Sequence, residues 1–254
     1  MNNIKQLIIL TVPHSFCLEN NKGSNYECDY RALECANIIS KILLNDTREV
    51  LIFPANINRV TLDLNRVTSD GFHKLLNDKI NSKITEIELN DTVNINNIIY
   101  LMDCHSFLGN FFGNASTTNP DVSILMANCI QLNYIQELRD LLGKKDIVTT
   151  IHLGSGNSII EKYFNYDQKN LQSNHIKMIP ILIEFNENLT NEKISNIGYC
   201  INQWIDIINI YFISIFQKNK AKQAILNSMD GNNNRHKYYK YKVKFINLVN
   251  NSYP

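Results

Sequence analysis

Apolar and polar residues follow one another along the chain in blocks that predict strands and helices in turn. Residues 7–12 form a continuous apolar run closed by Pro13, which is typical of a strand buried on both faces. In residues 29–44 the apolar positions recur at three- and four-residue spacing, which predicts a helix. The same criteria predict further strands at 50–53, 98–103, 122–126, 147–151 and 178–185, and further helices at 70–76, 133–142 and 190–216. The last helix has Thr190 or Asn191 as its N-cap. Strands alternating with helices predict a three-layer α/β/α fold with a mostly parallel or mixed central sheet.

Composition and charge exclude several classes of protein. The chain has 254 residues, of which 44% are hydrophobic, enough for a substantial core and against global disorder. The net charge of +1 favours neither nucleic acid nor a membrane surface as a partner. Six cysteines are scattered without zinc-ribbon spacing, and the first apolar run is too short for a secretory signal. We therefore expect reduced cysteines, a cytoplasmic location and no membrane partner.

The C-terminal part of the sequence differs from the rest. We predict a catalytic domain at 1–217 and a basic, aromatic-rich extension at 218–254. Lysine and aromatic residues alternate from Tyr238 to Phe245. This pattern favours a solvated tail or a lysine-protected edge strand over a nucleic-acid patch within 218–245.

Two histidines directly follow or end predicted strands. His14 follows the first strand and His105 lies at the end of a central one. In open α/β sheets, functional groups gather beyond the carboxyl ends of the strands. Catalytic zinc takes three protein ligands from His and Asp or Glu and keeps one position open. The pair therefore predicts a site for one zinc ion, with Asp29 as third ligand and Glu19 or Cys17 as alternatives.

The segment between the two histidines is rich in side chains that bind anions. Arg59, Asn65 and Arg66 fall within eight residues, and arginine holds a carboxylate through two parallel hydrogen bonds. We expect these residues to bind a substrate carboxylate, and an arginine beside the metal to stabilise a developing oxyanion. We expect Asp63 to orient a neighbour rather than to react.

A hydrolase that uses zinc also needs a general base. Glu184 lies near the end of an apolar strand, where a carboxylate is costly unless it serves a site. We therefore predict Glu184 as the base, with Glu187 as the alternative.

Taken together, these segments resemble the N-formylglutamate amidohydrolase family, which is related to zinc carboxypeptidases and aspartoacylases. The resemblance covers about residues 7 to 190, and no single segment carries it alone. The matching segments, in order, are Pro13-His14-Ser15, Asp29-Tyr30, Arg59 with Asp63-Leu64-Asn65-Arg66, Asp103-Cys104-His105-Ser106-Phe107, Pro120-Asp121-Val122, Gly154-Ser155-Gly156 and Ile183-Glu184-Phe185-Asn186.

The resemblance implies a zinc-carboxypeptidase-like fold with one zinc ion per chain. It implies His14 and His105 as ligands, Glu184 as base, and Arg59, Asn65 and Arg66 on the substrate carboxylate and oxyanion, with Arg59 counted as catalytic. Cys17 stands where the related carboxypeptidases have glutamate, so the third ligand stays open. The expected function is hydrolysis of an amide bond in a small carboxylate-bearing substrate, such as an N-acyl or N-formyl acidic amino acid. The alternatives are a carboxypeptidase acting on a peptide C-terminus and a non-catalytic binding protein of the same fold.

Overall fold

The computed structural model describes residues 5–16, 28–29, 31–59, 61–66, 71–89, 95–108, 119–153, 158–163 and 176–230. The chain divides into two compact units, Met1–Ile213 and Ser214–Pro254, and the sheet lies within the first. Several predicted features lie outside the described residues: Cys17, Glu19, Tyr30, the Gly154-Ser155-Gly156 turn and the alternating segment from Tyr238 to Phe245.

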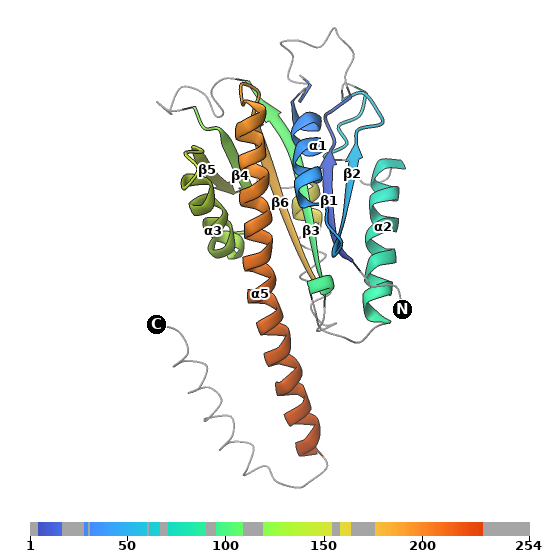
Figure 1. Ribbon diagram of the computed structural model, residues 1–254. Helices are drawn as coiled ribbons and strands as arrows, with labels where there is room; N and C mark the ends of the chain where they lie inside the picture. Colours follow the sequence, from blue (N-terminus) through green and yellow to red (C-terminus); the bar gives the residue numbers. More distant parts are fainter. Residues whose placement is uncertain are drawn as a thin grey trace. The chain divides into compact units, whose positions relative to one another are not determined.

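Within the described residues, six strands form one sheet in the order β2-β1-β3-β6-β4-β5 (Figure 1). The strands are β1 (Gln6–Val12), β2 (Arg48–Pro54), β3 (Ile98–Phe107), β4 (Val122–Met126), β5 (Thr149–Leu153) and β6 (Lys177–Asn186). The helices are α1 (Ala32–Leu43), α2 (Gly71–Glu88), α3 (Leu132–Gly143) and α5 (Asn191–Asp230), with 3₁₀ turns at Ile95–Asn97 and Cys129–Gln131 and a helical turn at 159–163.

The sheet is mixed, as predicted. β2, β1, β3 and β6 run parallel to one another, and β4 pairs parallel with β5. β4 pairs antiparallel with β6, so one pair of strands runs against the rest. The carboxyl ends of β1, β3 and β6 therefore lie side by side at one edge of the sheet.

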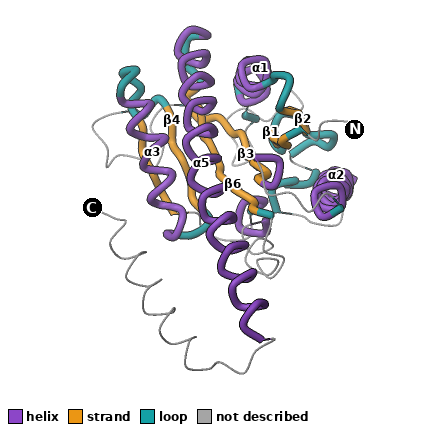
Figure 2. The backbone as a smooth tube through the Cα atoms, turned by 60° about the horizontal axis from the view of Figure 1, so that its bottom comes forward, coloured by secondary structure: helices purple, strands orange, loops and turns teal. Residues whose placement is uncertain are grey.

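Helices cover both faces of the sheet, which confirms the three-layer arrangement (Figures 1 and 2). On one face, alternate residues such as Leu7, Ile99 and Met178 pack against α2 and the 159–163 turn in a single apolar cluster. On the other face, Tyr100 of β3 contacts α5, since its ring lies 5.5 Å from that of Trp204 and its hydroxyl donates to Asn209.

Three elements are longer than their sequence patterns predict. β3 continues to Phe107 rather than ending at Asp103, and α2 continues to Glu88 because its buried Ile80 and Ile87 keep helical spacing with Phe72. Packing of this apolar stripe outweighs the weak helix propensity of the polar residues in between. α5 continues to Asp230 instead of ending near 216. Its N-cap is Thr190, whose Oγ1 accepts from the Lys193 N–H at 3.2 Å.

Among the described residues, no helix has both the length and the apolar character needed to cross a membrane.

Candidate metal centre

Strand register brings the predicted site residues together at the carboxyl edge. Thr11 of β1 lies opposite Asp103 of β3, and His105 of β3 lies directly opposite Glu184 of β6. His14 follows in the turn after β1, and Asp29 precedes α1. Because side chains directly opposite each other in a sheet share a face, His105 and Glu184 point to the same side.

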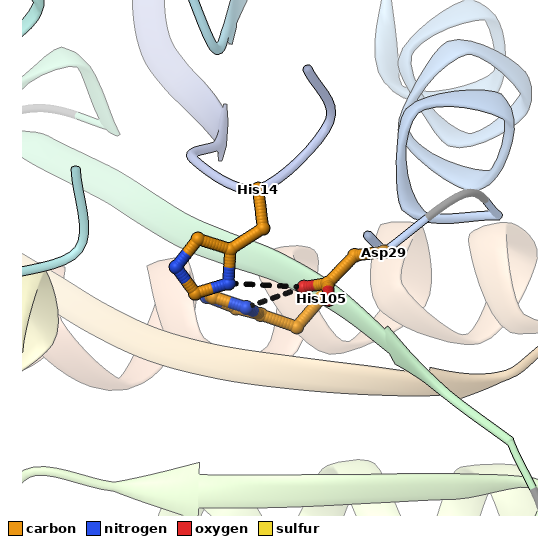
Figure 3. Close-up of side chains that lie close together, drawn as sticks. All are labelled: His14, Asp29 and His105. Carbon is orange, nitrogen blue, oxygen red and sulfur yellow. Dashed lines mark hydrogen bonds and ion pairs between the residues drawn. The ribbon is translucent and has the colours of Figure 1, made fainter. Parts of the chain in front are cut away.

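His14, Asp29 and His105 converge on one buried point (Figure 3). Asp29 Oδ2 lies 3.3 Å from His14 Nδ1 and 2.8 Å from His105 Nδ1. One possible ligand atom from each residue lies within 4.8 Å of the others, and the two imidazole rings meet edge to face with centroids 4.6 Å apart. Two ring nitrogens and a carboxylate oxygen are the ordinary protein ligands of catalytic zinc, so the group is suited to one metal ion.

A second carboxylate contacts the far side of each imidazole. His14 Nε2 lies 2.8 Å from Asp63 Oδ1, and His105 Nε2 lies 3.1 Å from Asp103 Oδ2. Asp103 is fully buried, and its Oδ1 accepts a 2.7 Å hydrogen bond from the Thr11 hydroxyl. A carboxylate behind a histidine fixes the ring orientation and leaves the other nitrogen to bind a metal.

The charged side chains of this group shift one another's pKa values. Burial acts to raise the pKa of Asp29, but the hydrogen bonds from His105 and His14 outweigh it and hold the pKa below its usual value. Burial acts to lower the pKa of His105, but the charge and hydrogen bond of Asp103 raise it well above its usual value. The protein thus favours positive charge between these carboxylates, whether carried by protons or by a metal cation.

The predicted anion-binding residues lie beside this group. Arg59 Nη1 donates to Asp29 Oδ1 at 3.1 Å. Arg66 Nε lies 3.5 Å from Asp63 Oδ2, and the Arg66 side chain is 55% exposed. Asn65 is buried, its Nδ2 lies 3.2 Å from His105 Nε2, and its Oδ1 accepts from the backbone of Ile159. All three line the same cavity. Arg59 contacts Asp29, Arg66 contacts Asp63, and Asn65 lies beside His105.

Of the two predicted bases, Glu184 lines the cavity. Burial raises its pKa to about 8, with smaller contributions from the surrounding charges. A metal cation beside it would lower that pKa, because an opposite charge favours the ionised carboxylate. The carboxylate of Glu187 instead accepts a 2.9 Å hydrogen bond from the Ser106 hydroxyl.

The cavity has a volume of about 270 Å³. His14, Asp29, His105 and Glu184 line it together with apolar side chains from β4, β6 and the 159–163 turn. A space of this size suits a small molecule better than a long segment of peptide.

Two findings go beyond or against the sequence prediction. Asp103 and Thr11 were not predicted as site residues, although the two-residue spacing of Asp103 and His105 places them on one face of a strand. The expectation of reduced cysteines is wrong for Cys28, which is disulfide-bonded, whereas Cys35, Cys104, Cys129 and Cys200 are free.

Comparison with known proteins gives no family assignment. No protein-family model matches the sequence, and no curated protein matches it. Among solved structures, the chain is similar to the gene product Atu2144 from Agrobacterium tumefaciens, with 11% identity and a TM-score of 0.49 over 80% of this chain and 88% of that one. The catalytic domain of CwlV, an N-acetylmuramoyl-L-alanine amidase from Bacillus (Paenibacillus) polymyxa, gives 13% identity and a TM-score of 0.41 over 79% and 96%. A mutant of murine aminoacylase 3 gives 12% identity and a TM-score of 0.39, over 86% of this chain and 66% of that one. Similarity at this level carries no argument about function, which has to come from the site itself.

Proposed function

We propose that this chain is a zinc-dependent hydrolase that cleaves an amide bond in a small, carboxylate-bearing substrate. The observation that carries the proposal is a proton count. Four contacts join the two imidazoles to carboxylates: His14 to Asp29 and Asp63, and His105 to Asp29 and Asp103. Two neutral imidazoles carry only two N–H groups between them, so the four contacts require a positive charge, from protonated rings or from a metal ion. A metal ion held by His14, Asp29 and His105 would stand in place of the missing protons at Asp29, and both rings would keep an N–H group for Asp63 and Asp103.

Zinc fits this donor set better than magnesium or calcium does. Magnesium and calcium prefer ligand shells made of oxygen, whereas two imidazoles with one carboxylate are a usual zinc set. His14, Asp29 and His105 would hold the ion. Zinc bound there polarises a carbonyl group and makes water a better nucleophile near neutral pH.

The residues of the chain supply the proton transfers. Glu184 lies directly opposite His105 in the sheet and lines the cavity. Its carboxylate is placed to take a proton from the attacking water and to return it to the departing amine nitrogen. The backbone pairing of β3 and β6 fixes its position relative to the ligands, so the base is held on a rigid element.

The two arginines have separable roles in this proposal. Arg59 donates to the Asp29 oxygen that the histidines do not share, so it orients this ligand and places positive charge beside the developing oxyanion. The Arg66 side chain is half exposed at the cavity and is placed to bind the substrate carboxylate. Asn65 accepts from the backbone N–H of Ile159 and so holds the 159–163 turn beside the site.

Substitution of the proposed base tests the proposal. In Glu184→Gln we expect zinc content to stay at one per chain and kcat to fall by about 10²- to 10⁴-fold, the usual contribution of a general base. Glu187→Gln is the matched control, because this neighbouring carboxylate bonds to Ser106, and it should keep its turnover. Full turnover by zinc-loaded Glu184→Gln would refute the assignment of the base.

The choice of test substrates separates the related functions. N-acyl amino acids and short peptides both present a terminal carboxylate, and the small cavity favours the former. Faster release of a C-terminal residue from a peptide would identify a carboxypeptidase instead. A chain with full zinc and no turnover of either class would be a binding protein.

A further inference from the structure

The cavity beside the metal group is lined by both polar and apolar side chains. His14, Asp29 and Arg59 are among the polar ones. The aliphatic lining residues, here called the aliphatic wall, are Leu125 of β4, Leu182 of β6 and Ile160 of the helical turn. None of these three residues has a part in the proposed chemistry, so their presence requires another explanation.

The register of β4 and β6 brings two residues of the aliphatic wall together. Leu125 lies directly opposite Leu182, so the two side chains are neighbours on one face of the sheet. The same register places Ser123 opposite Glu184, two residues before Leu125 on β4 and two residues after Leu182 on β6. Because a strand rises about 3.4 Å per residue, the wall begins roughly 7 Å from the row that holds Glu184 and His105. That separation is within the length of a substrate of a few carbon atoms.

The charges of the described lining residues match one substrate carboxylate. Arg59 is hydrogen-bonded to Asp29 at 3.1 Å, whereas the half-exposed Arg66 makes a longer contact with Asp63, 3.5 Å from Nε. Glu161 and Glu184 also line the cavity, and both would repel a second substrate carboxylate. The aliphatic wall would in addition take such a group out of water without a hydrogen-bond partner.

We propose that the cavity selects a substrate with a single carboxylate and a compact aliphatic group, and that the aliphatic group lies against Leu125 and Leu182. The inference rests on the proposed function for its chemistry, but ligand binding can test it without turnover. It departs from the N-acyl acidic amino acids that the sequence resemblance implies, because these carry two carboxylates.

The first experiment compares two ligands that cannot be hydrolysed. Titration calorimetry of the zinc-loaded full chain would measure binding of 4-methylpentanoate, which has one carboxylate and a branched aliphatic end, and of glutarate, which has two carboxylates. We expect 4-methylpentanoate to bind at least tenfold more tightly. Equal or tighter binding of glutarate would overturn the inference, whatever the enzyme hydrolyses.

The second experiment compares amide substrates. We expect kcat/KM for N-acetyl-leucine or for N-(4-methylpentanoyl)glycine to exceed that for N-acetyl-glutamate by about tenfold or more, in the range that hydrophobic pockets provide. Whichever of N-acetyl-leucine and N-(4-methylpentanoyl)glycine has the higher kcat/KM shows on which side of the amide the enzyme accepts the aliphatic group. Faster hydrolysis of N-acetyl-glutamate than of both would contradict the inference. Preferential binding of 4-methylpentanoate without turnover of any amide would refute the proposed function and leave the cavity preference standing.

A charge placed on the aliphatic wall should reverse the preference. Leu125 is partly exposed, so Leu125→Lys can extend its ammonium group into the cavity. We expect this variant to bind glutarate more tightly than wild type does and 4-methylpentanoate more weakly. Leu44→Lys is the matched control. Leu44 is 58% exposed and lies close to the start of β2, which is the outermost strand on the other side of the sheet from β4 and β5. An unchanged ratio of the two affinities in folded, zinc-loaded Leu125→Lys would also overturn the inference.

Discussion

Two buried polar clusters lie at opposite ends of the sheet, and they differ in how their hydrogen bonds are balanced. At the amino-terminal end, the amide cluster consists of Gln6, Tyr100 and Asn209. Gln6 Nε2 donates to Asn209 Oδ1 at 2.8 Å, Asn209 Nδ2 donates back to Gln6 Oε1 at 3.2 Å, and the Tyr100 hydroxyl donates to the same Asn209 oxygen. Each neutral donor has an acceptor, which is what a structural polar cluster requires.

At the carboxyl-terminal end, the imidazole cluster consists of His14, His105 and the three carboxylates Asp29, Asp63 and Asp103. Here the contacts with acceptors outnumber the protons that two neutral rings can donate. Burial of polar groups is therefore common to both clusters, and the excess of negative charge distinguishes the one that is suited to a cation. Substitutions in one cluster should therefore leave the other unchanged.

Asp29→Ala should have the largest effect on metal binding, because it removes the one carboxylate that both Nδ1 atoms face. We expect zinc affinity to fall by more than 100-fold, beyond the loss that an outer partner causes. Competition with a chromophoric chelator would measure it. The hydrogen bonds of Asn209 should be unaffected. A wild-type zinc affinity in Asp29→Ala would show that Asp29 is not a ligand.

Asp103→Asn should have a smaller effect on the same property. The amide keeps the shape of the carboxylate but holds the His105 ring less strongly, and losing an outer partner of this kind costs about 10- to 100-fold in metal affinity. The same competition assay applies. A loss as large as that of Asp29→Ala would indicate that Asp103 is itself a ligand.

Asn209→Ala should change stability and leave metal binding unchanged. It leaves Gln6 Oε1 without its donor, whereas Gln6 Nε2 and the Tyr100 hydroxyl keep backbone carbonyl oxygens as acceptors. We expect a cost of about 1–3 kcal/mol in the free energy of unfolding. Urea unfolding of the wild type and the variant would measure this difference. A drop in zinc affinity without loss of stability would contradict the separation of the two clusters.

Thr11→Val should have the smallest effect. It removes the hydroxyl that donates to Asp103 Oδ1 but keeps the side-chain shape. We expect a loss of less than tenfold in zinc affinity and about 1 kcal/mol in stability. A larger loss of affinity than in Asp103→Asn would be inconsistent with Thr11 acting through Asp103.

The sequence predicts the imidazole cluster better than it predicts its surroundings. His14 and His105 could be placed because residues beyond parallel strands gather at one edge, whatever the strand order. The pairing of β3 with β6, which puts Glu184 opposite His105, depends on sheet order and register, and these are set by contacts between residues about eighty positions apart.

Asp103 was within reach of the sequence prediction, because it lies two residues before His105. The strand that the sequence pattern predicts ends at Asp103, however, so the pattern does not place Asp103 and His105 on one face of the same strand. The contact of Arg59 with Asp29 was out of reach, since the spacing of residues does not fix the direction of a long side chain. The same holds for the aliphatic wall, because Leu125 and Leu182 meet only through the antiparallel pairing of β4 with β6.

The most direct test of the central claim is the zinc content of the purified full chain, measured by elemental analysis for wild type beside His105→Ala and Asn209→Ala. The account predicts close to one zinc per chain in wild type and in Asn209→Ala, and little zinc in His105→Ala. A wild type without metal, or zinc that stays in full when His105 is removed, would contradict it.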